Sequence, residues 1–292
     1  MKSHRRTVAR LCTAALLAAG VLARGQQVPN EPQHQFGTSI TGAFEGWFSN
    51  PDGSHSLLVG YYNRNQTQEL DIPIGPNNRI EPGGPDRGQP THFLTSRQWG
   101  MFIVTVPKEF TPQQRLTWTL VANGQPTIIP LTLHTDYEIN PFTEVAVHNT
   151  PPVLAFEEKG PTTQGPIAMV AKAVSRAAPA SSPLALTVWA TDDAKYTSGS
   201  NAPRRNPGPE VTLTWSKFRG PGTVSFDKAK PEMEKLQGGE AAFYGKATTM
   251  VKFDQPGDYV VHVTANDSSG VGGGGGFVCC WSTALVKVSV TP

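Results

Sequence analysis

Alternation of apolar and polar residues is the sequence feature that most constrains this chain, and it is clearest between Val211 and Ala265. In short stretches of this region, mostly apolar residues occupy every second position, and turns rich in Gly and Pro separate the stretches. A period of two is typical of β-strands with one buried face. The three rows are Val211, Leu213 and Trp215; Thr249, Val251 and Phe253; and Tyr259, Val261, Val263 and Ala265.

The composition favours the same class of structure for the whole chain. It holds 29 Gly and 26 Pro in 292 residues and almost no segment with helical periodicity, which predicts an all-β fold. The length suits two domains rather than one. We expect two β-sandwich domains, residues 39–141 and 151–292, joined by a linker over residues 142–150.

The first 25 residues have the features of an export signal. A basic start precedes an apolar run over Leu11–Ala23, and the small residues around Ala23-Arg24-Gly25 favour cleavage before Gln26. Arg5-Arg6 leaves a twin-arginine signal as an alternative. The run is too short to span a bilayer comfortably. We expect an exported, periplasmic or extracellular protein with no transmembrane segment after cleavage and a flexible lead-in over residues 26–38.

Removing this signal reverses the sign of the net charge. The signal carries five of the 25 basic residues and none of the 23 acidic ones, so 20 basic and 23 acidic residues remain, a net charge of −3. Nucleic acid is therefore not an implied partner. A protein or polysaccharide of the cell envelope or its surroundings is the expected partner.

The two cysteines that remain after cleavage, Cys279 and Cys280, are adjacent. Cα atoms of ordinary disulfides lie roughly 4.4–6.8 Å apart, whereas those of chain neighbours lie about 3.8 Å apart. We expect a disulfide between them that is more easily reduced than an ordinary one. A reactive thiol pair and bridges to a partner chain are the alternatives.

Turn signals organise the first domain. Asp52-Gly53 predicts a hairpin with apolar residues on both faces, and Asn123-Gly124 predicts a second one. Leu70–Ile74 suggests an edge strand because it contains Pro73, and a long Pro/Gly loop follows over residues 75–93. For the first hairpin we expect the pairs Phe48–Leu57, Gly46–Val59 and Phe44–Tyr61 on one face, and Trp47–Leu58 and Ala43–Tyr62 on the other.

The second domain resembles a PKD-type immunoglobulin-like domain of exported bacterial proteins. The matching residues are Asn149-Thr150-Pro151-Pro152, Asp192-Asp193, Trp215, the stretch Gly220–Phe226, Pro256-Gly257-Asp258-Tyr259 and Ala265-Asn266-Asp267. The resemblance implies an immunoglobulin-type sandwich with Trp215 in the core and Tyr259 at the tyrosine corner. A polar insertion over residues 157–183 departs from the pattern, and its piece Ile167–Ala178 is compatible with a short helix. Residues 38–141 look like the leading part of exported bacterial proteins.

Four oxygen-bearing side chains are candidate calcium ligands: Asp192, Asp193, Asn266 and Asp267. In an immunoglobulin-like sandwich the loops after the second and sixth strands emerge at the same end, so these residues are expected to converge. Calcium takes six to eight oxygen ligands. The alternative is that the four side chains cap turns.

Two aromatic residues and a glycine tract are candidate binding elements. Trp47 and Tyr62 share a face of the predicted hairpin, where they form either a platform for sugar rings or part of the core. The tract Gly272–Gly276 satisfies G-x-G-x-x-G with its flanks, but a strand rather than a helix follows, which excludes a dinucleotide site. It predicts a flexible loop, with ligand binding as the alternative.

Catalytic patterns are not evident. The sequence has neither G-x-S-x-G nor H-E-x-x-H, and its histidines lack ligand spacing; Glu81, Asp86 and His92 merely share the long loop. We expect a non-catalytic exported protein for adhesion, cell-envelope assembly or ligand display. A carbohydrate-binding module and an unrecognised secreted hydrolase are the alternatives, the latter because triads are defined by geometry rather than by sequence order.

Overall fold

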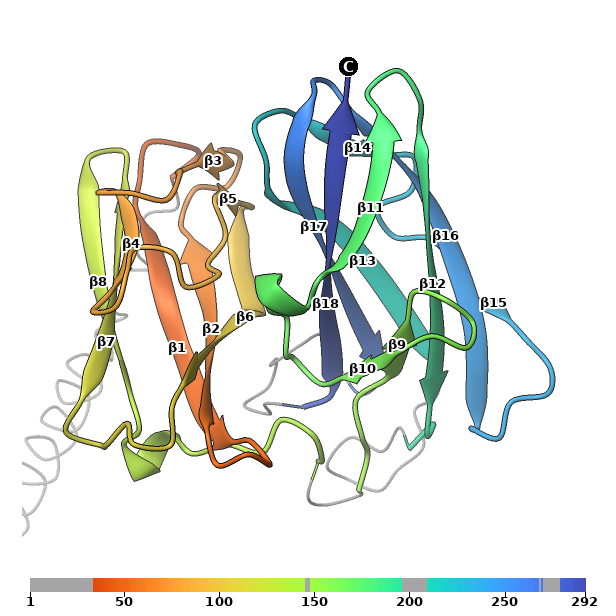
Figure 1. Cartoon of the computed structure of the whole chain (residues 1–292), viewed down its shortest axis with the longest axis horizontal. Coiled ribbons are helices and arrows are strands. Elements are labelled where there is room, and N and C mark those ends of the chain that lie inside the picture. Colours follow the sequence, from red (N-terminus) through yellow and green to blue (C-terminus); the bar gives the residue numbers. More distant parts are fainter. Residues whose placement is uncertain (1–33, 145–147, 196–208, 268, 270–278) are drawn as a thin grey trace, which may run out of the picture. The chain divides into compact units, whose positions relative to one another are not determined.

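The computed structural model describes residues 34–144, 148–195, 209–267, 269 and 279–292, and their regular structure is β apart from two single 3-10 turns, η1 (Thr135–Tyr137) and η2 (Val170–Lys172). This confirms the all-β class (Figure 1). In this described part, no helix is both long and apolar enough to cross a membrane.

The C-terminal half is a sandwich of two sheets. One runs β10-β9-β12-β16-β14, with β15 also beside β16, and the other runs β11-β18-β17-β13. In the letters of an immunoglobulin-like fold, β9-β12-β16-β14 is the order A-B-E-D and β11-β18-β17-β13 is the order A′-G-F-C. The strand β11 is parallel to β18. The strands are β9 (Val153–Ala155), β10 (Thr162–Gln164), β11 (Val174–Pro179), β12 (Leu184–Asp192), β13 (Val211–Arg219), β14 (Val224–Phe226), β15 (Glu234–Lys235), β16 (Phe243–Phe253), β17 (Gly257–Asp267) and β18 (Trp281–Thr291).

The alternating residues that predicted this sandwich fill its core. Trp215 is 2% exposed and stacks on Phe226. Tyr259 packs on Phe253 and donates its hydroxyl to the carbonyl of Gln255 at 2.9 Å, which is the geometry of a tyrosine corner. Both elements that the resemblance implied are therefore in place.

The N-terminal half consists of three small antiparallel sheets, β1-β2-β6, β4-β7-β8 and β3-β5. Its core is aromatic, with Tyr61, Phe93, Phe102 and Trp118 all fully buried and in ring contact. The strands are β1 (Ile40–Ser49), β2 (His55–Asn63), β3 (Leu70–Asp71), β4 (Asn78–Glu81), β5 (His92–Phe93), β6 (Ser96–Val106), β7 (Arg115–Ala122) and β8 (Gln125–Thr132).

The predicted hairpin at Asn123-Gly124 is confirmed, but the register of the first hairpin was wrong. Asn123 and Gly124 have φ angles of 49° and 74°, as a type I′ turn requires. In the first hairpin Trp47 pairs with Leu57 rather than Leu58, and a bulge between Phe44 and Gly46 shifts the rest again.

The cause of that shift is the turn. Gly53, with φ of 82°, donates its N–H to the carbonyl of Asn50 at 2.9 Å, so the loop is longer than two residues. Pro51 occupies the second position of this turn, where proline is favoured. A turn centred on Asp52-Gly53 alone leaves the effect of this proline out.

Three further expectations need correction. The loop over residues 75–93 contains β4, which pairs with β7, and the strand predicted at Leu70–Ile74 is only the two-residue β3, since Pro73 has no N–H for a ladder. The piece Ile167–Ala178 forms η2 and then β11 rather than a helix, because its C-terminal part completes the sheet beside β18. Tertiary pairing overrides local helix propensity there.

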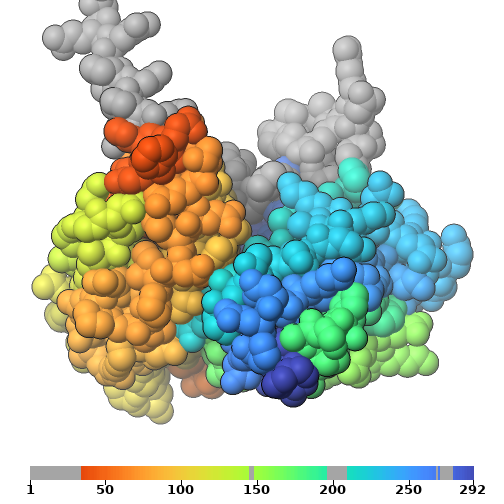
Figure 2. Space-filling view, turned by 90° about the horizontal axis from the view of Figure 1, so that it is seen from above, coloured from red at the N-terminus to blue at the C-terminus, as the bar shows by residue number. Residues whose placement is uncertain are grey.

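Residues 35–292 form one compact unit, and its two halves share hydrophobic clusters. Phe218, Val260 and Leu285 of the sandwich belong to the same buried cluster as the core of the N-terminal half. Trp281 joins Phe48 of the N-terminal half in a second cluster. Figure 2 shows the orange and yellow N-terminal half directly against the cyan and blue C-terminal half. The predicted domain boundaries stay a prediction.

Candidate functional site

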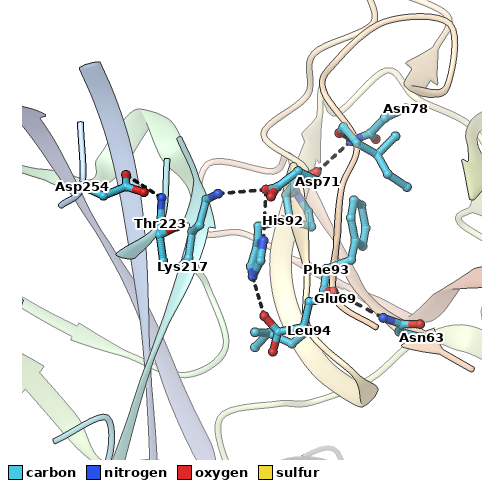
Figure 3. Close-up of polar contacts among 12 residues, drawn as sticks. Asn63, Glu69, Asp71, Asn78, His92, Phe93, Leu94, Lys217, Thr223 and Asp254 are labelled. Atoms are coloured by element: carbon cyan, nitrogen blue, oxygen red, sulfur yellow. Dashed lines mark hydrogen bonds and ion pairs between the residues drawn. The ribbon is translucent and has the colours of Figure 1, made fainter. Parts of the chain in front are cut away.

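A group of charged side chains lies where the β3-β5 ladder meets β13. His92 in β5 places Nδ1 3.0 Å from Oδ1 of Asp71 and Nε2 3.1 Å from Oε2 of Glu69. Lys217 of β13 donates from Nζ to the same Asp71 oxygen at 2.9 Å. Figure 3 shows Asp71 between the imidazole and the ammonium group. We call Glu69, Asp71, His92 and Lys217 the charge cluster.

A second set of contacts continues along β13. Arg219 forms a bidentate pair with Asp86, at 2.9 and 2.8 Å, and donates from Nε to the carbonyl of Gln89 at 2.8 Å. These hydrogen bonds from Arg219 hold the pKa of Asp86 below its usual value. The backbone N–H of Thr91 donates to the carbonyl of Phe218 at 3.0 Å. Ion pairs and a backbone bond thus join the same two segments.

Buried asparagines position the segments that carry the cluster. Asn78, 0% exposed, donates to the carbonyls of Ile72 and Pro90 and accepts from the indole of Trp118 at 3.0 Å. Asn63 donates to the carbonyl of Phe93. Each amide satisfies backbone groups that would otherwise be buried without partners, which costs about 1–3 kcal/mol per group. They hold Asp71 and His92 next to each other.

His92 has both ring nitrogens within hydrogen-bond distance of carboxylate oxygens. A general base in a catalytic triad instead keeps one nitrogen for a nucleophile hydroxyl. Asp71 and Glu69 are 59% and 50% exposed, whereas the side chain of Lys217 is only 7% exposed. The arrangement therefore neutralises a nearly buried cation at the contact between the halves.

Two of the predicted calcium residues, Asp193 and Asp267, lie near each other at one end of the sandwich, beside residues 149 and 150 of the linker. Asn149 donates to Oδ2 of Asp267 at 2.6 Å, and Thr150 donates from its N–H and hydroxyl to Asp193 at 3.2 and 3.0 Å. Asp267 also accepts from the N–H of Ser269 at 2.8 Å. Burial, with the nearby charge of Asp193 as a smaller contribution, raises the pKa of Asp267.

The bonds from Ser269 to Asp267 and from Ala194 to Asp192 span two residues and cap turns, whereas those from Asn149 and Thr150 bridge 118 and 43 residues. Asp192 accepts from the N–H of Ala194 at 2.8 Å, and Asn266 is 9% exposed in β17. In the described ranges, no three His, Cys, Asp or Glu side chains are grouped to hold a metal ion. Cys279 and Cys280 form a disulfide, and the sulfur of Cys280 lies 3.4 Å from the carbonyl oxygen of Asn149. The tract Gly272–Gly276 lies outside the described residues.

Trp47 and Tyr62 do not share an exposed face. Trp47 is 8% exposed and donates its indole N–H to the carbonyl of His134 at 2.8 Å, so it belongs to the core. Tyr62 is 40% exposed, and the guanidinium of Arg64 lies 5.4 Å from its ring centroid. The coplanar pair that the sugar platform required is absent at these two positions.

Sequence reasoning missed most of the charge cluster. His92 and Asp86 were noted only as members of the long loop, and Glu81 pairs locally with Arg79 at 2.9 Å. Asp71 and Lys217 are 146 residues apart, and no local pattern connects them. One signal was present: Lys217 and Arg219 are charged residues at the end of a strand whose other residues are apolar or carry hydroxyl groups.

The comparisons with known proteins give no family. No family model matches the chain, and no curated protein matches it. The D00-D0 domain of intimin is 11% identical with a TM-score of 0.25, covering 87% of this chain and 100% of that one. The adhesin CfaE of enterotoxigenic E. coli, in a mutant form, is 8% identical with a TM-score of 0.24, covering 90% of each chain. Latent PorU from Porphyromonas gingivalis is 9% identical with a TM-score of 0.27, covering 86% of this chain and 24% of that one. TM-scores in this range do not establish a common fold.

Proposed function

We propose that this chain is an exported, non-catalytic module for adhesion, envelope assembly or ligand display. One observation supports it most: the convergent Asp, His, Glu and Lys side chains join the two β halves to each other. In this proposal their role is structural rather than catalytic. The export signal expected over residues 1–25 supports a location outside the cytoplasm.

The hydrophobic contact explains how such a module would keep two surfaces in a fixed relation. Phe218, Val260 and Leu285 are at most 7% exposed, although each lies on the sheet that faces the other half. Burying an apolar side chain of this size contributes about 1.5–3 kcal/mol. Apolar packing alone does not specify how the two halves align. The ion pairs of Lys217 and Arg219 specify that alignment, because each requires a particular partner at a particular position.

Two measurements test this proposal together. Beads coated with the purified protein are expected to retain bacterial envelope material, while beads coated with heat-denatured protein do not. Generic ester, glycoside and peptide substrates are expected to show no turnover above the buffer rate. Turnover that disappears in His92→Gln but persists in His134→Gln, a variant of an exposed histidine, would contradict the proposal and favour a hydrolase. Absence of retention would contradict it equally.

A further inference from the structure

The outer edge of β6 is only partly paired. The backbone N–H of Ile103 donates to the carbonyl of Ala168 at 3.0 Å, so Ile103 directs its backbone groups away from β2, which pairs with the inner edge of β6. The direction of these groups alternates along an antiparallel ladder. Thr105, two residues further on, therefore directs its N–H and its carbonyl to the outer edge, and neither has a backbone partner among the described residues.

The segment that begins to pair with this edge turns away after one hydrogen bond. Residues 170–172 form the 3-10 turn η2, in which the N–H of Lys172 donates to the carbonyl of Met169 at 3.0 Å. Figure 1 shows this green turn next to β6. A 3-10 turn uses its backbone groups internally, so it does not continue the ladder. The outer edge of β6 is thus left open at Thr105.

A groove of about 380 Å³ lies at this open edge. It is lined by residues 103–105 of β6, residues 169–171 and residues 86–88. Met169 packs on the same apolar cluster as Ile103, and Val170 packs on the cluster that contains Val104. The groove therefore combines apolar walls with the unpaired backbone groups of Thr105. We call it the β6-edge groove.

Arg87 brings a positive charge to the β6-edge groove without a carboxylate to balance it. Its Nη2 donates to the carbonyl of Pro82 at 2.8 Å, its Nε is buried without an acceptor, and it forms no ion pair among the described residues. The carboxylate of the neighbouring Asp86 is occupied by both terminal nitrogens of Arg219. A buried guanidinium donor without an acceptor is unfavourable, so an incoming carboxylate gains a partner here.

We propose that the β6-edge groove binds an extended segment of a partner protein. The segment adds to β6 through the backbone of Thr105 and places an Asp or Glu side chain on Arg87. This inference rests on the proposed function, because it names the class of partner that such a module holds. Open strand edges bind extended peptides through main-chain hydrogen bonds, and apolar walls accept their alternate side chains. The unbalanced charge of Arg87 selects an acidic segment over a neutral or basic one.

The test uses short peptides, blocked at both ends, in which valine alternates with serine and one glutamate is moved along the sequence. Fluorescence polarisation measures their affinity for the purified full chain. For the tightest binder, replacing glutamate by glutamine is expected to weaken binding about tenfold. Added salt is expected to weaken the glutamate peptide more than the glutamine peptide.

A second measurement tests the main-chain pairing on the unaltered protein. N-methylation of every second amide blocks one edge of an extended peptide and leaves the other edge free. Because only one edge of the peptide faces β6, methylation in one of the two registers is expected to weaken binding about tenfold and methylation in the other register to leave it nearly unchanged. Equal effects in both registers would contradict the pairing.

Two variants locate the site. Arg87→Gln is expected to weaken the glutamate peptide about tenfold and to leave the glutamine peptide unchanged. The matched control is Arg115→Gln, at an exposed arginine of the same half that does not line the groove. Thr105→Pro removes the N–H at the open edge and is expected to weaken both peptides to the same extent. Its melting temperature, compared with that of the unaltered protein, shows whether it is folded.

Three further results would overturn the inference. They are no binding by any peptide of the set, equal weakening in Arg87→Gln and Arg115→Gln, and tighter binding of dodecanoate, an apolar carboxylate without a peptide backbone. Failure here remains distinct from failure of the proposed function. If beads coated with Arg87→Gln retained as much envelope material as beads coated with the unaltered protein, the groove would be removed as the site and the adhesion module would remain.

Discussion

Aspartates lie close together at two places, the contact between the two halves and the loop end of the sandwich. Their carboxylates accept hydrogen bonds from different kinds of donor at the two places. At the contact, Asp71 and Asp86 accept from Lys217 and Arg219, which are 146 and 133 residues away. At the loop end, Asp267 accepts from the amide of Asn149, 118 residues away, and from the N–H of Ser269 in the turn that follows it. Cations join the two halves at the contact, whereas the donors to Asp267 are neutral.

The pKa values of the aspartates at the two places shift in opposite directions. Hydrogen bonds from Arg219 lower the pKa of Asp86, because they favour its charged form. Burial raises the pKa of Asp267, because hydrogen bonds from Asn149 and Ser269 offset only part of the desolvation. The same residue type therefore stabilises the fold in opposite pH ranges at the two places.

The largest effect is expected from the apolar part of the contact. Phe218→Ala removes a ring that is 0% exposed within the shared cluster, and we expect the free energy of unfolding to fall by about 3–5 kcal/mol. Urea denaturation measures it. Phe36→Ala, at a ring 72% exposed, is the control and is expected to change stability by less than about 0.5 kcal/mol. Similar losses in both variants would mean that the halves do not share a core.

A second effect comes from His262 in β17, which stacks on Phe218 with ring centroids 6.0 Å apart. Burial lowers the pKa of His262 from 6.5 to about 3, so the unfolded chain binds the proton first as the pH falls. Stability is complete above about pH 6.5 and is lost toward pH 3, by roughly 3 kcal/mol at pH 4.

The measurement for His262 is urea unfolding at pH 7 and pH 4 beside His262→Leu. The leucine variant lacks this titration, so its loss of stability on acidification is expected to be smaller by about the same 3 kcal/mol. Parallel losses in the two proteins would show that His262 reaches solvent in the folded state.

A smaller effect separates the two kinds of aspartate. Asp86 contributes stability above its ordinary pKa that is lost as the pH falls, whereas the stability from Asp267 is present at low pH and lost as the pH rises through its raised pKa. Relative to the unaltered protein, Asp86→Asn is expected to lose stability as the pH rises from 3 to 7, by about 1 kcal/mol, because Asp86 is half exposed. Asp267→Asn is expected to gain over the same range. If the stability of both variants, relative to the unaltered protein, changed in the same direction with pH, the distinction between Asp86 and Asp267 would not hold.

The smallest expected effect is that of calcium. The carboxylates of Asp193 and Asp267 already accept from Thr150 and Asn149, so the melting temperature is expected to be the same with calcium and with a chelator. A bound ion at a hundredfold excess over its dissociation constant would instead add about 2.7 kcal/mol. A calcium-dependent rise that Asp267→Asn removes would restore the predicted metal site.

Much of the fold could be predicted because its signals are local. The alternation in residues 211–265 determines which side chains face the sandwich core, and Asn123-Gly124 leaves few turn types open. Trp215 and Tyr259 occupy the places expected of the core tryptophan and the tyrosine corner of an immunoglobulin-type sandwich. Each of these signals lies within a few residues of the structure that it determines.

The remaining features depend on distant partners. Trp47 is buried and donates its indole N–H to the carbonyl of His134, 87 residues away, and the sequence offers no sign of that pairing. The charge cluster needs β13 to lie beside β5, which follows from the packing of Phe218 rather than from the spacing of charges. Residues 174–179 become a strand only because β18 provides an edge for them.

The central claim is that Asp71 and Lys217 join the two halves through a specific pair, and a double-mutant cycle tests it most directly. Unfolding by urea is measured for the unaltered protein, Asp71→Asn, Lys217→Met and the double variant. We expect a coupling energy of about 1–2 kcal/mol, since Lys217 is nearly buried while Asp71 is half exposed. Additive effects, with coupling below about 0.3 kcal/mol, would contradict the account and free the charge cluster for another role.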